Sequence, residues 1–140
     1  MYKMTQEIFK ELSKDSNLKA FIEETPSSSY VWLQFSTASG VSYRIRFTSN
    51  SDDDHYVAVR VFGLVSVEPE YETQMLSIIN ELNSQYLFVK FVMEDNGDIN
   101  LEYDYLVSDP NPAASAIELV VRISTIVDEV YPKLMRAMWA

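Results

Sequence analysis

The stretch INELNSQYLFVKFVMEDNGDINLEYDY, residues 79–105, decides the fold. It begins with a helical pattern and continues into two runs in which apolar and polar residues alternate. Alternation with a period of two is typical of a strand that has one buried face. Asn96-Gly97 separates the runs and favours a type I′ turn, in which both central residues have positive φ. We therefore predict a helix that leads directly into a β-hairpin.

The predicted hairpin has one apolar face and one polar face. Residues expected to face the core are Leu87, Val89, Phe91 and Met93 in the first strand, and Ile99, Leu101, Tyr103 and Tyr105 in the second. Lys90 is expected on the polar face, opposite Glu102 or Asp104. Such cross-strand pairs stabilise a sheet modestly.

The rest of the chain adds helices at both ends and three more strands. Thr5 is a plausible N-cap for one kinked helix, or two short helices, that reaches Ile22. Strands are predicted over 30–35, 41–48 and 56–67, and a helix over 67–84. Asn111 caps a last helix that runs to Trp139, and Pro132 is expected to kink or break it near Tyr131.

This order, α-β-β-β-α-β-β-α, predicts an α+β fold with two layers. One layer is a five-stranded, mostly antiparallel sheet, and the other consists of helices on one face of it. Residues 1–140 contain no linker-like segment, and 140 residues is a usual length for one domain. We therefore expect a single domain over residues 1–140.

Composition restricts the partners. The net charge is −10, which repels phosphate backbones and anionic lipids, so neither nucleic acid nor a membrane is expected as a partner. There are no cysteines, and no signal peptide or membrane-spanning segment is recognisable. We therefore expect a cytoplasmic protein.

Catalytic and metal-binding motifs are sparse. His55 is the one histidine, and it follows the carboxylates Asp52 and Asp54 in a predicted loop. Neighbouring loop residues point in different directions, so a solvated loop is the expected structure. We predict no catalytic residue, no metal and no cofactor. A metal-binding or hydrolytic protein that uses these three residues is the alternative.

One group of basic and aromatic residues favours protein binding. Arg44, Arg46 and Arg60 are predicted on the solvent-facing side of the sheet, with Trp32 beside them and Lys90 extending the group. Surfaces of this kind bind acidic or amphipathic peptide segments. The alternative is an outer face of ion pairs to carboxylates such as Glu102 and Asp104.

The last helix has a wide apolar arc that favours self-association. The residues expected to meet a second copy of the chain are Tyr131, Leu134, Met138 and Trp139. Burying them across a two-fold axis would form a homodimer. The alternative is that the arc lies within the protomer.

Residues 79–105, followed by VDEVYPKLMRAMW, resemble the YbjN-like proteins of bacteria, which are described as sensory transduction regulators. The matching features are Asn80 and Asn83 at the helix end, Lys90, the acidic-Gly turn and the Tyr-Pro pair. The resemblance implies a fold like that of type III secretion chaperones, which are acidic, dimeric and non-enzymatic. We thus expect a regulatory or chaperone-like protein that docks a partner segment on its sheet face or edge, or a purely structural subunit.

Overall fold

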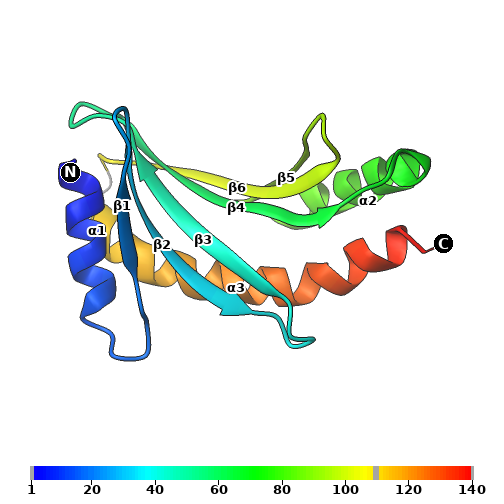
Figure 1. The fold of residues 1–140 in the computed structure, drawn as a ribbon, viewed down its shortest axis with the longest axis horizontal. Helices are drawn as coiled ribbons and strands as arrows, with labels where there is room; N and C mark the ends of the chain where they lie inside the picture. The colour runs from blue at the N-terminus through cyan, green and yellow to red at the C-terminus, as the bar shows by residue number, and fades with distance from the viewer. Residues whose placement is uncertain (1, 109–110, 140) are drawn as a thin grey trace.

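The structure, a computed structural model, describes residues 2–108 and 111–139 (Figure 1). In these residues it has three α-helices, six strands and a short 3₁₀ turn. The elements are α1 (Lys3–Ser13), β1 (Phe21–Glu24), β2 (Ser29–Ser36), β3 (Ser42–Ser49), β4 (Tyr56–Ser66), the 3₁₀ turn (Pro69–Tyr71), α2 (Glu72–Gln85), β5 (Lys90–Met93), β6 (Asp98–Leu106) and α3 (Pro112–Ala137).

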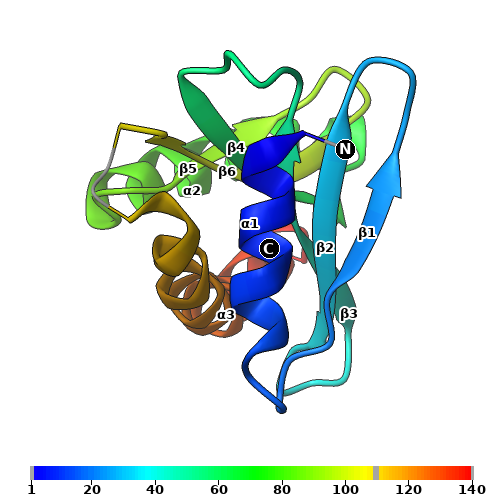
Figure 2. The same ribbon diagram turned by 90° about the vertical axis from the view of Figure 1, so that its left-hand side faces the viewer.

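All the strands form one sheet in the order β1-β2-β3-β4-β6-β5, and every neighbouring pair is antiparallel. Helices α1 and α3 pack against each other beneath this sheet, and α2 packs against β5 and α3 (Figures 1 and 2). The predicted α+β fold is confirmed, but the sheet has six strands and not five.

The additional strand is β1, whose first two residues, Phe21 and Ile22, we expected to be helical. Phe21 pairs with Trp32 and Ile22 with Val31 of the neighbouring strand β2. A short apolar run is ambiguous between helix and strand when its partner is unknown. Pairing with β2 supplies the backbone hydrogen bonds that decide in favour of a strand.

The first helix also begins earlier than predicted, because Tyr2 and not Thr5 is its N-cap. The Thr5 hydroxyl lies inside the helix, where it is 2.9 Å from the Tyr2 carbonyl oxygen and 2.6 Å from the Ser29 hydroxyl. The bond to Ser29 connects α1 to the start of β2. Thr5 is fully buried at this contact.

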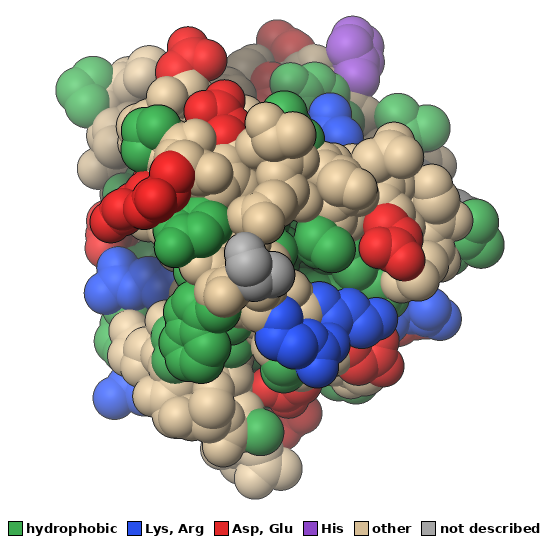
Figure 3. Space-filling view, turned by 90° about the vertical axis from the view of Figure 1, so that its right-hand side faces the viewer, with side chains coloured by type: hydrophobic (Ala, Val, Ile, Leu, Met, Phe, Trp, Pro, Cys, Tyr) green, Lys and Arg blue, Asp and Glu red, His purple; other side chains and the backbone are tan. Residues whose placement is uncertain are grey.

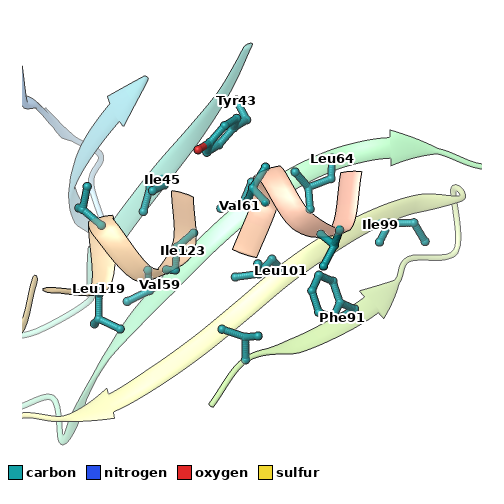
Figure 4. Packing of buried hydrophobic residues seen from close by; sticks show 14 of the residues in the cluster. Tyr43, Ile45, Val59, Val61, Leu64, Phe91, Ile99, Leu101, Leu119 and Ile123 are labelled. Atoms are coloured by element: carbon teal, nitrogen blue, oxygen red, sulfur yellow. The ribbon is translucent and has the colours of Figure 1, made fainter. Parts of the chain in front are cut away.

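The core lies between α3 and the apolar faces of the central strands. Figure 4 shows side chains of β3, β4 and β6 close to Leu119 and Ile123 of α3. Asn111 caps this helix as predicted, since its side chain accepts a hydrogen bond from the Ala114 N–H. The helix is not broken at Pro132, which lies within Pro112–Ala137. None of the described helices is both long and apolar enough to span a bilayer.

The β5–β6 hairpin forms as predicted, but with a different turn and a shorter first strand. Within this turn only Gly97 has positive φ, at 91°, so the turn is not type I′. The Gly97 N–H donates to Glu94 O at 2.9 Å, and the Glu94 N–H donates to Asp98 O at 2.8 Å. This is the three-residue loop in which a left-handed glycine follows the turn.

Leu87 lies outside β5 and is 89% exposed, so its predicted place in the core is wrong. The strand begins only at Lys90. Helix α2 ends at Gln85, so Asn83 in its last turn lies beside β5. The Asn83 side chain accepts from the Phe91 N–H at 2.7 Å and donates to the Phe91 carbonyl oxygen at 3.1 Å. These bonds close the outer edge of β5 at Phe91.

The substitution Gly97→Ala tests the turn. A Cβ at Gly97 would collide with the Val67 carbonyl oxygen, and φ lies in the left-handed region. We expect the free energy of unfolding to fall by about 1–3 kcal/mol or more in urea titrations. Gly40→Ala is the control, since Gly40 has φ 89° but the methyl group of an alanine there would meet nothing within 4 Å. Equal losses in both variants would show that the contact with Val67 does not matter.

Candidate partner-binding site on the outer sheet face

The strand register places four of the predicted binding residues in one row across the outer face of the sheet. Trp32 pairs with Arg46, and Arg46 pairs with Arg60. Arg60 in turn pairs with Glu102, which also pairs with Lys90. Arg44 lies one outward position further along β3. The sheet therefore brings all five residues to the face opposite the core.

One half of this row is neutralised by carboxylates. Arg60 Nη1 lies 2.6 Å from Asp104 Oδ1, and Arg60 Nε lies 3.8 Å from Glu102 Oε2. Lys90 Nζ lies 3.7 Å from Glu102 Oε1, as the hairpin pattern predicted. For Arg60 and Lys90 the structure thus agrees with the alternative interpretation of a face of ion pairs.

The other half of the row is different, because Arg44 and Arg46 lie on aromatic rings. The Arg44 guanidinium is 3.8 Å from the centroid of the Trp32 ring, and that of Arg46 is 3.7 Å from the Tyr30 centroid. Within residues 2–108 and 111–139 no carboxylate forms a salt bridge with either arginine. Contacts of this kind hold the cation in place without cancelling its charge.

The hydrogen-bond donors of these two guanidinium groups are only partly used. Arg44 Nε donates to Gln34 Oε1 at 3.4 Å. Arg46 Nε is buried and has no hydrogen-bond partner among the described residues. A buried donor without a partner costs free energy, and a ligand acceptor would gain that free energy if the guanidinium shifts to expose Nε on binding.

Glu23 of β1 orients the aromatic rings. Its carboxylate accepts from the Tyr30 hydroxyl at 2.6 Å and from Trp32 Nε1 at 3.0 Å. The hydrogen bonds from Tyr30 and Trp32, and then the charges of Arg44 and Arg46, lower the pKa of Glu23. The same bond to Glu23 raises the pKa of Tyr30.

Strand β1 also supplies Phe21, whose ring stacks on Trp32 at 4.3 Å between centroids. Our sequence prediction missed Phe21 because it extended the first helix to Ile22, and it missed Glu23 because it assigned no element between that helix and the strand over 30–35. A signal was available in the turn-forming residues that follow, Thr25-Pro26-Ser27-Ser28. In the structure they form a turn in which the Thr25 N–H donates to the Ser28 carbonyl oxygen at 2.8 Å. Such a turn between two apolar runs favours a hairpin.

These side chains surround a pocket with a volume of about 320 Å³. Its lining residues are Glu23, Tyr30, Trp32, Ser42, Tyr43, Arg44, Arg46 and Phe62. Phe62 is 55% exposed and its ring lies 5.5 Å from the Arg46 guanidinium. The pocket thus combines two cations, one carboxylate that is bonded to Tyr30 and Trp32, and apolar ring surface. With the cations in excess, it can bind a carboxylate next to an apolar group.

The residues expected at a dimer interface are not all at the surface. Leu134 is fully buried in the protomer, because α3 turns it toward the core, so its predicted role at an interface needs correction. Tyr131 and Met138 are partly buried against the core, and Trp139 is 79% exposed. Hydrophobic, acidic and basic side chains are interspersed at this end of the molecule (Figure 3).

The loop that contains Asp52, Asp54 and His55 is held by hydrogen bonds to backbone groups. Asp52 Oδ1 accepts from the Lys3 N–H at 2.7 Å, and Asp54 Oδ2 accepts from the Asn50 N–H at 2.6 Å. His55 is exposed. No group of three or more His, Cys, Asp or Glu side chains that could hold a metal occurs among the residues with described positions.

Comparison with known proteins identifies the family. Residues 16–135 match the model of the YbjN family, whose description is "Putative bacterial sensory transduction regulator". The match spans β1 to most of α3, and therefore includes every residue of the outer-face pocket. No significant match was found among curated proteins or among solved structures. The chain belongs to the YbjN family.

Proposed function

We propose that this chain is a non-enzymatic protein-interaction module, regulatory or chaperone-like, that docks an acidic segment of a partner protein on its outer sheet face. The observation that supports this most is the pair Arg44 and Arg46, cations on aromatic rings without a carboxylate partner among the described residues, in a protein of net charge −10. The description of the family as regulators is compatible with such a role.

The mechanism follows from the chemistry of the pocket. A carboxylate of the partner accepts hydrogen bonds from the guanidinium groups, and a shift of the Arg46 side chain on binding brings its buried, unpartnered Nε to the same acceptor. An apolar side chain next to that carboxylate packs on Phe62 and Trp32. Because Glu23 already holds the rings of Tyr30 and Trp32, little side-chain entropy is lost on binding.

The charge of the whole chain limits what this site accepts. A long polyanion, such as nucleic acid or an anionic membrane, would extend over the acidic remainder of the surface and be repelled. A short acidic segment mainly experiences charges within about 8–10 Å, the screening length at physiological salt. The site therefore favours a short peptide segment over a polyanion. We also propose that the protein and its partners are cytoplasmic.

We also propose that the protein forms a homodimer through the end of α3, with Trp139 as its main exposed contact. Light scattering at several concentrations should then give twice the mass of 16.1 kDa, and Trp139→Asp should return the monomer mass. Leu76→Asp is the control, because Leu76 is an exposed apolar residue of α2. A monomer mass of the unchanged protein at every concentration would remove the dimer.

Reversal of the two unpaired cations tests the binding site. In a Trp139→Phe background Trp32 is the one tryptophan, so its fluorescence reports binding of a synthetic peptide that contains Asp, Glu and Phe. We expect Arg44→Glu with Arg46→Glu to weaken binding by about tenfold or more, since charge-assisted hydrogen bonds are lost. The same double change should prevent capture of natural partners from a bacterial lysate.

The matched control is Arg122→Glu with Arg136→Glu, which changes the net charge equally on α3, away from the pocket. Thermal unfolding of both double variants establishes that each is folded. Equal binding by the two double variants would show that the outer-face pocket is not the site.

The pH dependence of Trp32 fluorescence tests the part played by Glu23. Because hydrogen bonds and nearby cations lower the pKa of Glu23, its bonds to the rings form above the ordinary glutamate pKa of 4.5 and are lost only as pH falls through a lower folded-state pKa. We expect a fluorescence transition centred below 4.5 that is absent in Glu23→Gln. A transition at or above 4.5, or one that persists in Glu23→Gln, would contradict this role.

A further inference from the structure

Strand β6 has a neighbour on both sides for only part of its length. Strand β4 pairs with it from Asp98 to Leu106, whereas β5 pairs with it only from Ile99 to Glu102. Residues 86–89, which precede β5, do not form a strand. The segment Tyr103–Leu106 therefore has β4 on one side and no strand on the other.

The backbone of this segment has hydrogen-bonding groups that face the open side. The Val107 N–H donates to His55 O at 3.0 Å, so odd-numbered residues of β6 direct their backbone groups toward β4. Asp104 and Leu106 consequently direct theirs away from β4. Nothing in residues 2–108 or 111–139 bonds to these groups from the open side. The Phe91 edge, by contrast, is closed by Asn83.

A groove with a volume of about 650 Å³ lies beside this open edge, between α3 and residues 85–89. Tyr103 and Tyr105 of β6 are among its lining residues. Phe88 and Val121, on its two sides, are 67% and 59% exposed. Large apolar side chains that stay exposed on both sides of a groove favour an interaction site.

The charges at the groove favour a cationic ligand. Glu118 is paired with Arg122 at 2.8 Å. Glu129 accepts a hydrogen bond from the Tyr86 hydroxyl at 2.6 Å, but no basic side chain among the described residues forms a salt bridge with it. The groove thus has an excess negative charge on a chain of net charge −10, which opposes a second copy of the same chain.

We propose that an extended, basic and apolar segment of a partner protein adds to the sheet as a strand at Asp104–Leu106. Its backbone pairs with the open N–H and C=O groups, its alternate apolar side chains enter the groove, and a flanking Lys or Arg reaches Glu129. The inference rests on the proposed function only in treating the chain as an interaction module. It uses a different surface and a ligand of opposite charge.

The probe is a fluorescent synthetic peptide in which valine and threonine alternate between flanking lysines, with binding measured by anisotropy. Leu106→Pro removes the N–H that faces the open side. It leaves the hydrogen bonds between β6 and β4 in place, because the Leu106 N–H does not point toward β4. We expect it to weaken binding by about tenfold, the effect of one lost backbone hydrogen bond. Leu106→Ala keeps that N–H and should bind like the unchanged protein. Equal binding by both variants would overturn the proposal.

Two N-methylated forms of the peptide test whether it pairs with β6 as an added strand, even if Leu106→Pro does not fold. Alternate amides of an added strand face either β6 or solvent, so methylation of one set should abolish binding and methylation of the other set should preserve it. Equal binding of both forms would exclude strand addition. Val121→Asn should weaken binding and the control Leu76→Asn should not, because Leu76 lies outside the groove and neither change alters the charge.

The remaining outcomes separate this site from the outer-face pocket and from self-association. The Arg44→Glu, Arg46→Glu variant should bind the basic peptide unchanged, whatever its effect on acidic peptides. A peptide-free dimer that dissociates in Leu106→Pro would show that a second copy occupies the edge, and would overturn the assignment to a basic partner.

Discussion

The alternation of side chains along β2, β3, β4 and β6 is the constraint on which the rest of the structure depends. Each of these strands directs apolar residues such as Leu33, Ile45, Val59 and Leu101 toward the helical side, where they are buried. The residues between them are thereby placed on the opposite face, in register across the strands. A slip of one residue would exchange the two faces, so the same packing that forms the core also fixes the row of Trp32, Arg46 and Arg60.

The identity of the neighbouring strand decides how each cation in this row behaves. Strand β6 brings Glu102 and Asp104 to Arg60, which neutralises it. Strand β1 brings one carboxylate to the other half, but Glu23 is engaged by Tyr30 and Trp32. Arg44 and Arg46 therefore keep their charge, and the rings on which they lie are held in position. An acidic protein thus retains a small cationic surface.

The parts that could be predicted from the sequence are those specified by local pattern. Alternation identified the central strands and their outer residues, and Asn111 with Pro112 marked the start of α3. The missed features depend on partners distant in sequence. Phe21 and Glu23 belong to a strand only because β2 lies beside them, and Leu87 is exposed because Asn83 holds β5 further along the chain. Which arginines are neutralised depended on the order of the strands in the sheet, which no local pattern contains.

The Nε–H resonance of Arg46, observed by NMR in the free protein and with an acidic peptide, tests the central claim most directly. A buried, unpaired donor beside the Tyr30 ring should give a signal that is slow to exchange and shifted upfield by the ring, and that moves downfield when a carboxylate binds. A signal like that of a solvent-exposed arginine, unchanged by the peptide, would contradict the claim that the fold keeps this cation unpaired for a partner.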